Sequence, residues 1–276
     1  MEIPTPLDIL LDPLSLIILG MYAALMLWEA LFPARKLTKM KFWKLKGIIF
    51  FAFYFYISSY LPMLTDPLLG KYQLINLSAV GTIPSVIFAV LIYELAAYLW
   101  HRTMHRFDFL WKSFHQMHHS SERLDTYSAF IFSPLDMIGW TVVGSVALVW
   151  VVGLSPQAAT ATLLILTFLA IFQHANIKTP RWIGYLIQRP ESHTVHHGQG
   201  VHKYNYSDLP MWDMIFGTFF NPKNYEMEVG FYKGASDRIA DMLLFKDVSR
   251  PKGNPGAKPK GDILSDSYFF KRDVRS

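Results

Sequence analysis

The sequence predicts an all-α membrane protein: a polytopic helical bundle of about four to five spans, the last two forming a short hairpin, with a histidine-rich cap on the cytoplasmic face. Three observations support this prediction. Of the 276 residues, 52% are hydrophobic, which favours a membrane protein over an ordinary soluble domain. Five apolar runs approach the length of about 20 residues that a helix needs to cross a bilayer. All ten histidines lie between His101 and His202.

The five apolar runs are expected to form the spanning helices. They cover residues 13–32, 47–64, 83–100, 135–152 and 158–173. The first run is expected to stay as an anchor, because the acidic start MEIPTPLDILLD lacks the basic region of a cleaved signal peptide. The last two runs are short and separated only by residues 153–157, so they predict a helical hairpin. The sequence leaves open whether that hairpin crosses the bilayer fully.

Lysine and arginine predict the orientation. With five spans, one side holds the loop after the first span, the loop between the third and fourth, and everything after the fifth. That side carries 25 of the 26 Lys and Arg residues, and the other side carries only Lys71. By the positive-inside rule the basic side is cytoplasmic, and all ten histidines emerge there. Since the cations flank apolar runs, the net charge of +5 indicates topology and not binding of nucleic acid.

Three regions follow from this pattern. Residues 1–79 form an N-terminal transmembrane region, residues 80–222 carry the histidines, and residues 223–276 form a cytoplasmic C-terminal segment. The stretch RPKGNPGAKPKGD from Arg250 to Asp262 is rich in Pro, Gly and Lys. Such composition predicts that the last segment is partly disordered.

The histidines are grouped as metal ligands are. Positions i, i+3 and i+4 share one face of a helix. Three groups have this spacing: His101 and His105; His115, His118 and His119; His193, His196 and His197. Neutral imidazole binds Zn, Fe, Cu and Ni, and one ion takes about four to six ligands. The histidine count therefore favours a site for two adjacent ions over a site for one. It also favours a metal site over histidines that have only a structural role.

Ligand chemistry narrows the kind of centre. The chain has no cysteine, so iron–sulfur clusters and zinc ribbons are excluded. The HExxH motif of zinc proteases is absent as well. An all-nitrogen shell with open positions favours a redox iron pair that activates O2, whereas structural zinc takes about four closed ligands.

Three acidic residues are candidates for supporting roles. Glu94 lies inside the third apolar run, where an acid is a functional hypothesis by default. It precedes His101 by seven residues on the same helix face, so it could accept the second ring N–H of a ligand. The alternative is a structural hydrogen bond between helices. Glu191 and Asp213 could orient ligands or, for Glu191, cap a helix; ordinary surface ion pairs are the alternative for both.

The residues around these groups resemble the fatty acid hydroxylase / sterol desaturase superfamily. The resemblance covers roughly residues 80–222. It rests on the runs WHRTMHR from Trp100, LWKSFHQMHHS from Leu110 and PESHTVHH from Pro190, followed by Asn205-Tyr206 and by WDMIFGTF from Trp212. Members of that family are integral-membrane di-iron enzymes. They use O2 and two external electrons to hydroxylate, desaturate or oxidatively cleave lipids.

The resemblance implies a ligand set for two iron ions. The eight grouped histidines would be ligands, and His174 would be a ninth. The tenth position is open: His202 is either a ligand or a contact of the substrate or of a carboxylate such as Asp213. Glu94 stands where the family usually has Asp, so the charge is kept. No catalytic residue separate from the metal centre is expected.

The implied function is hydroxylation of a C–H bond in a fatty acyl, sterol or related lipid, with O2 as co-substrate. Desaturation and ether cleavage use the same centre and stay as alternatives. No histidine outside the band could ligate a haem, and no GxGxxG motif is present. The electrons are therefore expected from a separate ferredoxin, cytochrome or reductase. The predicted location is a bacterial inner membrane or the endoplasmic reticulum membrane, with the metal site facing the cytoplasm.

Two rival classes are disfavoured. A membrane metal transporter needs polar ligands along a path at membrane depth, whereas the histidines here gather at one face. A lipid-binding structural protein descended from such enzymes would not need all three histidine groups intact.

Overall fold

The computed structural model describes residues 3–201, 203–225 and 227–251, and it is mostly helical, as predicted. Among these residues, four helical segments are long and apolar enough to cross a membrane. They are α2 (Pro13–Leu31), α3 (Trp43–Leu69) with the short turn η1 (Gly70–Tyr72), α4 (Thr82–Arg106), and α7 (Pro134–Ser145) with its π-helical continuation η4 (Val146–Val151). The fifth apolar run forms the shorter helix α8 (Pro156–Phe172). The chain is therefore an integral membrane protein.

Three of these helices begin with the same local signal, an oxygen-bearing cap followed by proline. Asp12 accepts a hydrogen bond from the backbone N–H of Leu14 at the start of α2. Ser133 caps α7 and Ser155 caps α8 in the same way, by accepting from the third helical N–H. The proline at the first helical position has no N–H to leave unsatisfied, so each apolar run starts at a defined residue.

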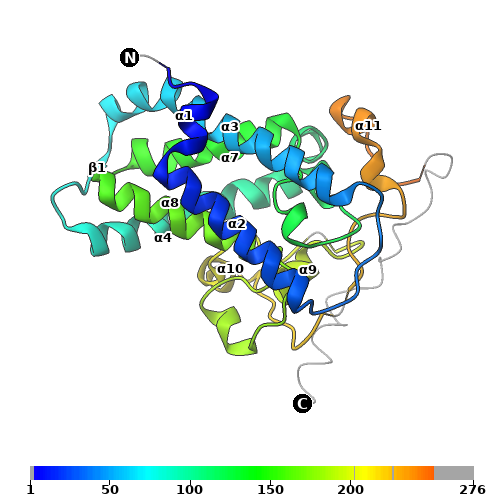
Figure 1. Ribbon diagram of the computed structural model, residues 1–276. Coiled ribbons are helices and arrows are strands. Elements are labelled where there is room, and N and C mark those ends of the chain that lie inside the picture. Colours follow the sequence, from blue (N-terminus) through cyan, green and yellow to red (C-terminus); the bar gives the residue numbers. More distant parts are fainter. Residues whose placement is uncertain (1–2, 202, 226, 252–276) are drawn as a thin grey trace.

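The last two apolar runs form the predicted hairpin, and its turn reaches the far end of the bundle. Strand β1 (Ile75–Asn76), after α3, pairs in parallel with β2 (Val152–Gly153), between η4 and α8. The N–H of Leu77 donates to the carbonyl of Gly153 at 2.8 Å. In Figure 1, β1 lies at the left end of the bundle, away from α9 and α11. The turn of the hairpin thus lies beside the connection between α3 and α4.

A buried acid fastens the first span to the histidine-bearing part of the chain. Glu29 lies in the last turn of α2 and is 6% exposed. One of its carboxylate oxygens accepts from the N–H and hydroxyl of Thr126, at 2.8 and 2.9 Å, and from the N–H of Asn176, at 2.9 Å. Thr126 opens the turn η3 (Thr126–Ser128), and Asn176 follows His174 by two residues. The N-terminal region therefore helps to position the cap.

Short helices form the cap over one end of the bundle (Figure 1). In chain order they are α5 (Asp108–Leu110), η2 (Trp111–His115), α6 (Gln116–His119), η5 (Arg181–Tyr185), α9 (Pro190–His196), α10 (Pro210–Ile215), η6 (Ala235–Asp237) and α11 (Ile239–Leu243). A six-residue helix, α1 (Pro6–Leu11), precedes the first span. Of the predicted C-terminal stretch from Arg250 to Asp262, all but the first two residues lie outside the described part of the chain.

Candidate metal centre

Four segments carry nine histidines into the space between the spans and the cap. The last two turns of α4 hold His101 and His105, and His174 follows α8 directly. The second group lies on η2 and α6, and the third lies on α9 and the residue after it. The turn η2 is π-helical, with the N–H of Gln116 bonded to the carbonyl of Trp111. Such π-bulges are frequent at functional sites, since they redirect the side chains that follow.

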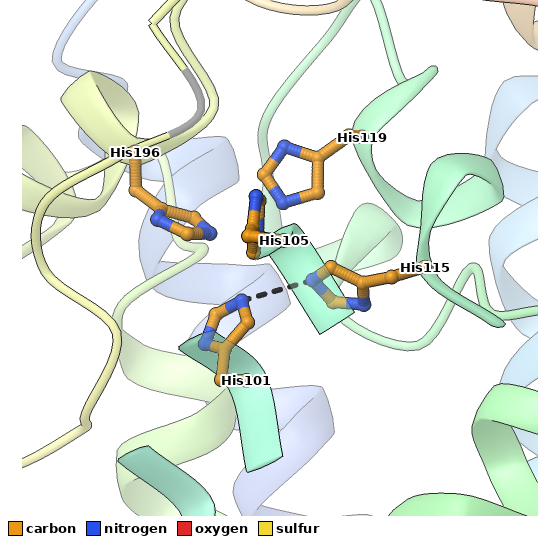
Figure 2. A group of neighbouring side chains, drawn as sticks. All are labelled: His101, His105, His115, His119 and His196. Atoms are coloured by element: carbon orange, nitrogen blue, oxygen red, sulfur yellow. Dashed lines mark hydrogen bonds between the residues drawn. The ribbon is translucent and has the colours of Figure 1, made fainter. Parts of the chain in front are cut away.

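The nine histidines separate into two clusters among the described residues. In each cluster one ligand atom per residue lies within 4.8 Å of all the others. The first, the five-histidine cluster, contains His101, His105, His115, His119 and His196. The second, the four-histidine cluster, contains His118, His174, His193 and His197. Figure 2 shows the five rings of the first cluster turned toward a common centre.

The second histidine group (His115, His118 and His119) and the third (His193, His196 and His197) each contribute to both clusters, which their spacing alone did not reveal. His115 and His119 belong to the five-histidine cluster, while His118 between them belongs to the other. The third group is divided in the opposite sense: His196 joins the five-histidine cluster, and its two companions join the four-histidine cluster. Successive helical residues differ by about 100° in direction, so neighbouring histidines diverge toward two centres. The two clusters are therefore neighbours built from shared helices.

The inward-facing nitrogens lie at the separation expected of ligands on one ion. The Nε2 atoms of His101 and His115 are 2.9 Å apart (Figure 2). In the four-histidine cluster, the Nε2 atoms of His118 and His174, of His174 and His193, and of His193 and His197 are each 3.1 Å apart. Imidazole nitrogens bind metals at about 2.0–2.1 Å, so two of them at right angles lie about 3 Å apart.

The outward-facing nitrogens determine which tautomer is present. Three rings have Nδ1 2.7 Å from a backbone carbonyl, which can only accept: His101 with Tyr206, His174 with Ala170 and His196 with Tyr204. The Nδ1 of His115 lies 2.9 Å from Oδ2 of Asp136, which likewise can only accept when the carboxyl group is ionised. These Nδ1 atoms therefore carry the proton, and each Nε2 directs a lone pair into its cluster. Facing lone pairs repel one another unless a cation lies between them, so the donor set fits two metal ions.

Burial keeps the imidazoles neutral, the form that binds metal. It lowers the pKa of His174 to about 4. Burial, reinforced by the charges of neighbouring histidines, holds the pKa values of His118, His193 and His197 well below the usual range. Protons therefore compete weakly for the ligand nitrogens near neutral pH.

We expect the metal-free protein to lose stability on acidification below about pH 6.5. The unfolded chain takes up a proton on His174 near its ordinary pKa of 6.5, whereas the folded state does so only near 4. His174 therefore does not lower the free energy of unfolding above pH 6.5. Below that pH it lowers this free energy by about 1.4 kcal/mol per pH unit, down to about pH 4. Thermal denaturation of the chelator-treated protein between pH 7 and 4 measures this slope. A flat profile would contradict it.

The sequence-predicted role of Glu94 is not the one that the structure gives. Its Oε2 accepts from the hydroxyl of Ser207 (2.9 Å) and from the N–H groups of Asp208 and Leu209 (2.8 and 3.1 Å), and none of the described histidine rings is hydrogen-bonded to it. Glu94 and His101 are both buried on α4, but residues 207–209, and not a histidine ring, bond to the carboxylate. Glu94 instead holds the loop whose Tyr206 carbonyl accepts from His101.

The carboxylate that does contact a ring is Asp136, which the sequence interpretation missed. It lies in the first turn of α7 and is fully buried. The sequence does contain a local indication. Ser133-Pro134 predicts a helix start after the second histidine group, and Asp136, two residues later, falls in the first turn of that helix. Only the tertiary arrangement shows which histidine it meets.

Asp213 and Glu191 organise loops and are not surface residues. Asp213 accepts from the N–H groups of Tyr206 and Ser207, both at 2.9 Å, and burial raises its pKa to about 6. Glu191 forms an ion pair with Arg189 at 3.1 Å, and both side chains are at most 1% exposed. The surface ion-pair alternative is therefore wrong for both acids. His202 lies outside the described residues, so its role stays a prediction.

A cavity connects the clusters to the spanning helices. Its volume is about 70 Å³. Its wall includes histidines of both clusters and residues from α3, α4, α7 and α8. A group that enters from between the spans would therefore meet the inward nitrogens of both clusters.

Comparisons with known proteins agree with this arrangement. Residues 86–218 match the family model described as fatty acid hydroxylase. The chain is 26% identical over 192 residues to ornithine lipid hydroxylase OlsE of Rhizobium tropici, covering 67% of this chain and 57% of that protein. It is 30% identical over 137 residues to sphinganine C4-monooxygenase 2 of Arabidopsis thaliana (48% and 53% covered) and 30% identical over 172 residues to Delta(7)-sterol-C5(6)-desaturase of Nicotiana tabacum (56% and 61% covered). The chain thus spans little more than half the length of these relatives. No solved structure matches it significantly.

Proposed function

The chain belongs to the fatty acid hydroxylase family of membrane lipid hydroxylases and desaturases, and on that premise we propose that it is a di-iron oxygenase that hydroxylates a lipid C–H bond. The observation that carries the proposal is the pair of buried histidine clusters, whose inward nitrogens face one another at about 3 Å. The histidine-box domain would be residues 80–222, between the N-terminal transmembrane region and the C-terminal segment.

The nine clustered histidines would hold two iron ions, five ligands on one side and four on the other. When bound, the iron pair supplies O2 activation and the oxidising power that an unactivated C–H bond requires. One oxygen atom of O2 enters the C–H bond, and the other leaves as water with two electrons and two protons. The chain's own residues hold the rings through their Nδ1 protons, exclude water, and place one lipid carbon beside the clusters.

Desaturation is the second candidate, because the tobacco relative with that activity aligns over 56% of this chain. Hydroxylation is preferred, since the Rhizobium relative, whose match covers 67% of this chain, is a lipid hydroxylase by name. Ether cleavage would use the same centre.

The test is metal analysis together with O2-dependent turnover. Purified protein should contain about two iron ions per chain, and membranes that contain it should gain a lipid with one added oxygen. Loss of two hydrogens from a lipid would instead identify a desaturase. Zinc flux into vesicles without O2 consumption would identify a metal transporter and would contradict the proposal.

The electrons are proposed to come from a separate ferredoxin, cytochrome or reductase on the cytoplasmic side, where the basic loops lie. This orientation can be tested because the chain has no cysteine. Lys71, on the loop after α3, and Lys178, after the histidine-bearing turn, are both exposed. In intact cells an impermeant maleimide should label Lys71→Cys and leave Lys178→Cys unlabelled until the cells are opened. The reverse pattern would place the metal site outside.

A further inference from the structure

The cavity beside the clusters has a polar corner in an otherwise apolar wall. Its apolar part consists of Ala97, Ala129, Phe130, Phe132, Trp140 and Ala170. Its polar part, apart from the histidines and Tyr206, consists of Tyr54, Tyr93, Gln173 and Asp208. These four residues come from α3, α4, the end of α8 and the loop before α10, so the fold gathers them from distant parts of the chain.

Asp208 is held in place but is short of hydrogen-bond donors. The side-chain amide of Gln173 donates to its Oδ1 at 2.6 Å, and Glu94 accepts from its backbone N–H at 2.8 Å. Within the described chain, no other hydrogen bond reaches the Asp208 carboxylate or the hydroxyls of Tyr54 and Tyr93. Burial raises the pKa of Asp208 to about 7, because a single donor does not replace the water that the carboxylate has lost.

A plain hydrocarbon chain cannot satisfy this corner. Polar groups that are removed from water without a hydrogen-bond partner are costly, and a carboxylate is the most costly of those present here. A hydroxyl or N–H on the substrate would supply the missing donor. An ester group has only acceptors, so it would give the Asp208 carboxylate no donor beyond Gln173.

The small size of the cavity limits the distance between the polar corner and the carbon that is oxidised. Its volume of about 70 Å³ is smaller than the cavity of about 150 Å³ that accepts a benzene ring in an engineered protein. Only a few heavy atoms of a lipid can therefore occupy it at one time. A donor beside Asp208 and a carbon beside the clusters must then be only a few bonds apart.

We propose that the substrate is a lipid with a hydroxyl or N–H donor a few bonds from the oxidised carbon, and that Asp208 accepts from this donor while Tyr54 and Tyr93 line its site. The inference rests on the proposed function and narrows its substrate class: oxidation occurs next to the polar group of the lipid and not at mid-chain.

The test uses the iron-loaded protein in vesicles with O2, an added ferredoxin with its reductase and NADPH as the source of electrons, and three lipids. A long-chain 1,2-diol offers only O–H donors, an N-acyl amino acid offers an amide N–H, and a diester phosphatidylcholine offers neither next to its chains. One or both donor lipids should be oxidised, with the new oxygen mapped by tandem mass spectrometry to a carbon near the donor. Comparison of the first two lipids shows which donor is used.

Variants of Asp208 and Tyr93 then test whether these side chains contact the donor of the lipid. Asp208→Asn should lower kcat/KM for the donor lipid about 10- to 100-fold, through KM and through scattered product positions, while iron content stays unchanged. Tyr93→Phe should give a smaller loss. Asp108→Asn, an acid whose side chain is 93% exposed, is the matched control and should behave as the wild type.

The outcomes separate this inference from the proposed function. Wild-type oxidation of the diester lipid at mid-chain, with Asp208→Asn and Tyr93→Phe unaffected, would overturn the inference alone. A wild-type protein that binds no iron and oxidises no lipid would overturn the proposed function and the inference with it.

Discussion

Replacing His118 with alanine should lower the iron content from about two ions per chain to about one and abolish lipid oxidation. His118 supplies an Nε2 atom 3.1 Å from that of His174, and its cluster has four histidines among the described residues. Three remaining ligands bind iron weakly, and the lone ion in the other cluster cannot replace the pair. The loss of turnover should exceed the 10- to 100-fold that is typical of a lost outer hydrogen-bond partner. Metal analysis of purified protein and product formation in vesicles measure both effects.

Two further variants make this result specific. His105→Ala leaves four histidines in the five-histidine cluster, so we expect it to retain more iron than His118→Ala does. Gln116→Ala removes a buried polar residue from the same helix, α6, that bonds to the carbonyls of Lys112 and Lys246 and to no histidine nitrogen. It controls for general damage to the cap and should keep both ions. Full iron loading and turnover in His118→Ala would remove the basis for the two-site assignment.

The spans could be predicted from the sequence because their signals are local. An apolar run of sufficient length forms a helix in a membrane, and an Asp or Ser cap followed by proline marks where α2, α7 and α8 begin. The grouping of histidines at helical spacing is equally local. The four long helices and the histidine clusters therefore agree with the fold class predicted from residue pattern.

The division of the histidines between two clusters could not be predicted in this way. It depends on the π-helical turn that ends at His115 and on the packing of the histidines at the end of α9 against those of α6, and neither is encoded in a spacing rule. The partners of Glu94 differ from the predicted histidine ring for a related reason. Its helix face was correctly identified, but a loop more than a hundred residues later supplies Ser207 and two N–H groups that its carboxylate accepts from.

A common physical requirement explains these long-range contacts. An acceptor for the outer N–H orients a metal-binding ring. Four of the nine clustered rings have one: loop carbonyls for His101 and His196, the carbonyl of Ala170 in α8 for His174, and a carboxylate for His115. The loop carbonyls must themselves be held, which is why Glu94 and Asp213 are buried around residues 206–209. The buried acids of this protein thus fix the ligands indirectly, except for Asp136.

Asp136→Asn should weaken iron binding and turnover about 10- to 100-fold without unfolding the protein. The Asp136 carboxylate accepts from Nδ1 of His115 at 2.9 Å, and the Nε2 of that ring lies 2.9 Å from the Nε2 of His101. The negative charge fixes the tautomer and increases the electron density on Nε2. Asparagine keeps the size and one oxygen acceptor, but it loses the charge, and its amide can turn a donor toward the ring. Chelator competition at fixed pH measures the iron affinity.

The matched control is Asp66→Asn, which alters a half-buried acid in α3 whose carboxylate accepts from Thr65 and which is not part of either cluster. It should leave iron affinity unchanged. If Asp136 were merely structural, Asp136→Asn would lower the thermal midpoint of the metal-free protein and leave the iron affinity of the folded protein intact. We expect the opposite pattern, because Ser133 caps the start of α7 through the backbone N–H of residue 136, and that bond survives the substitution. Unchanged iron affinity would mean that the other cluster members hold His115 without the carboxylate.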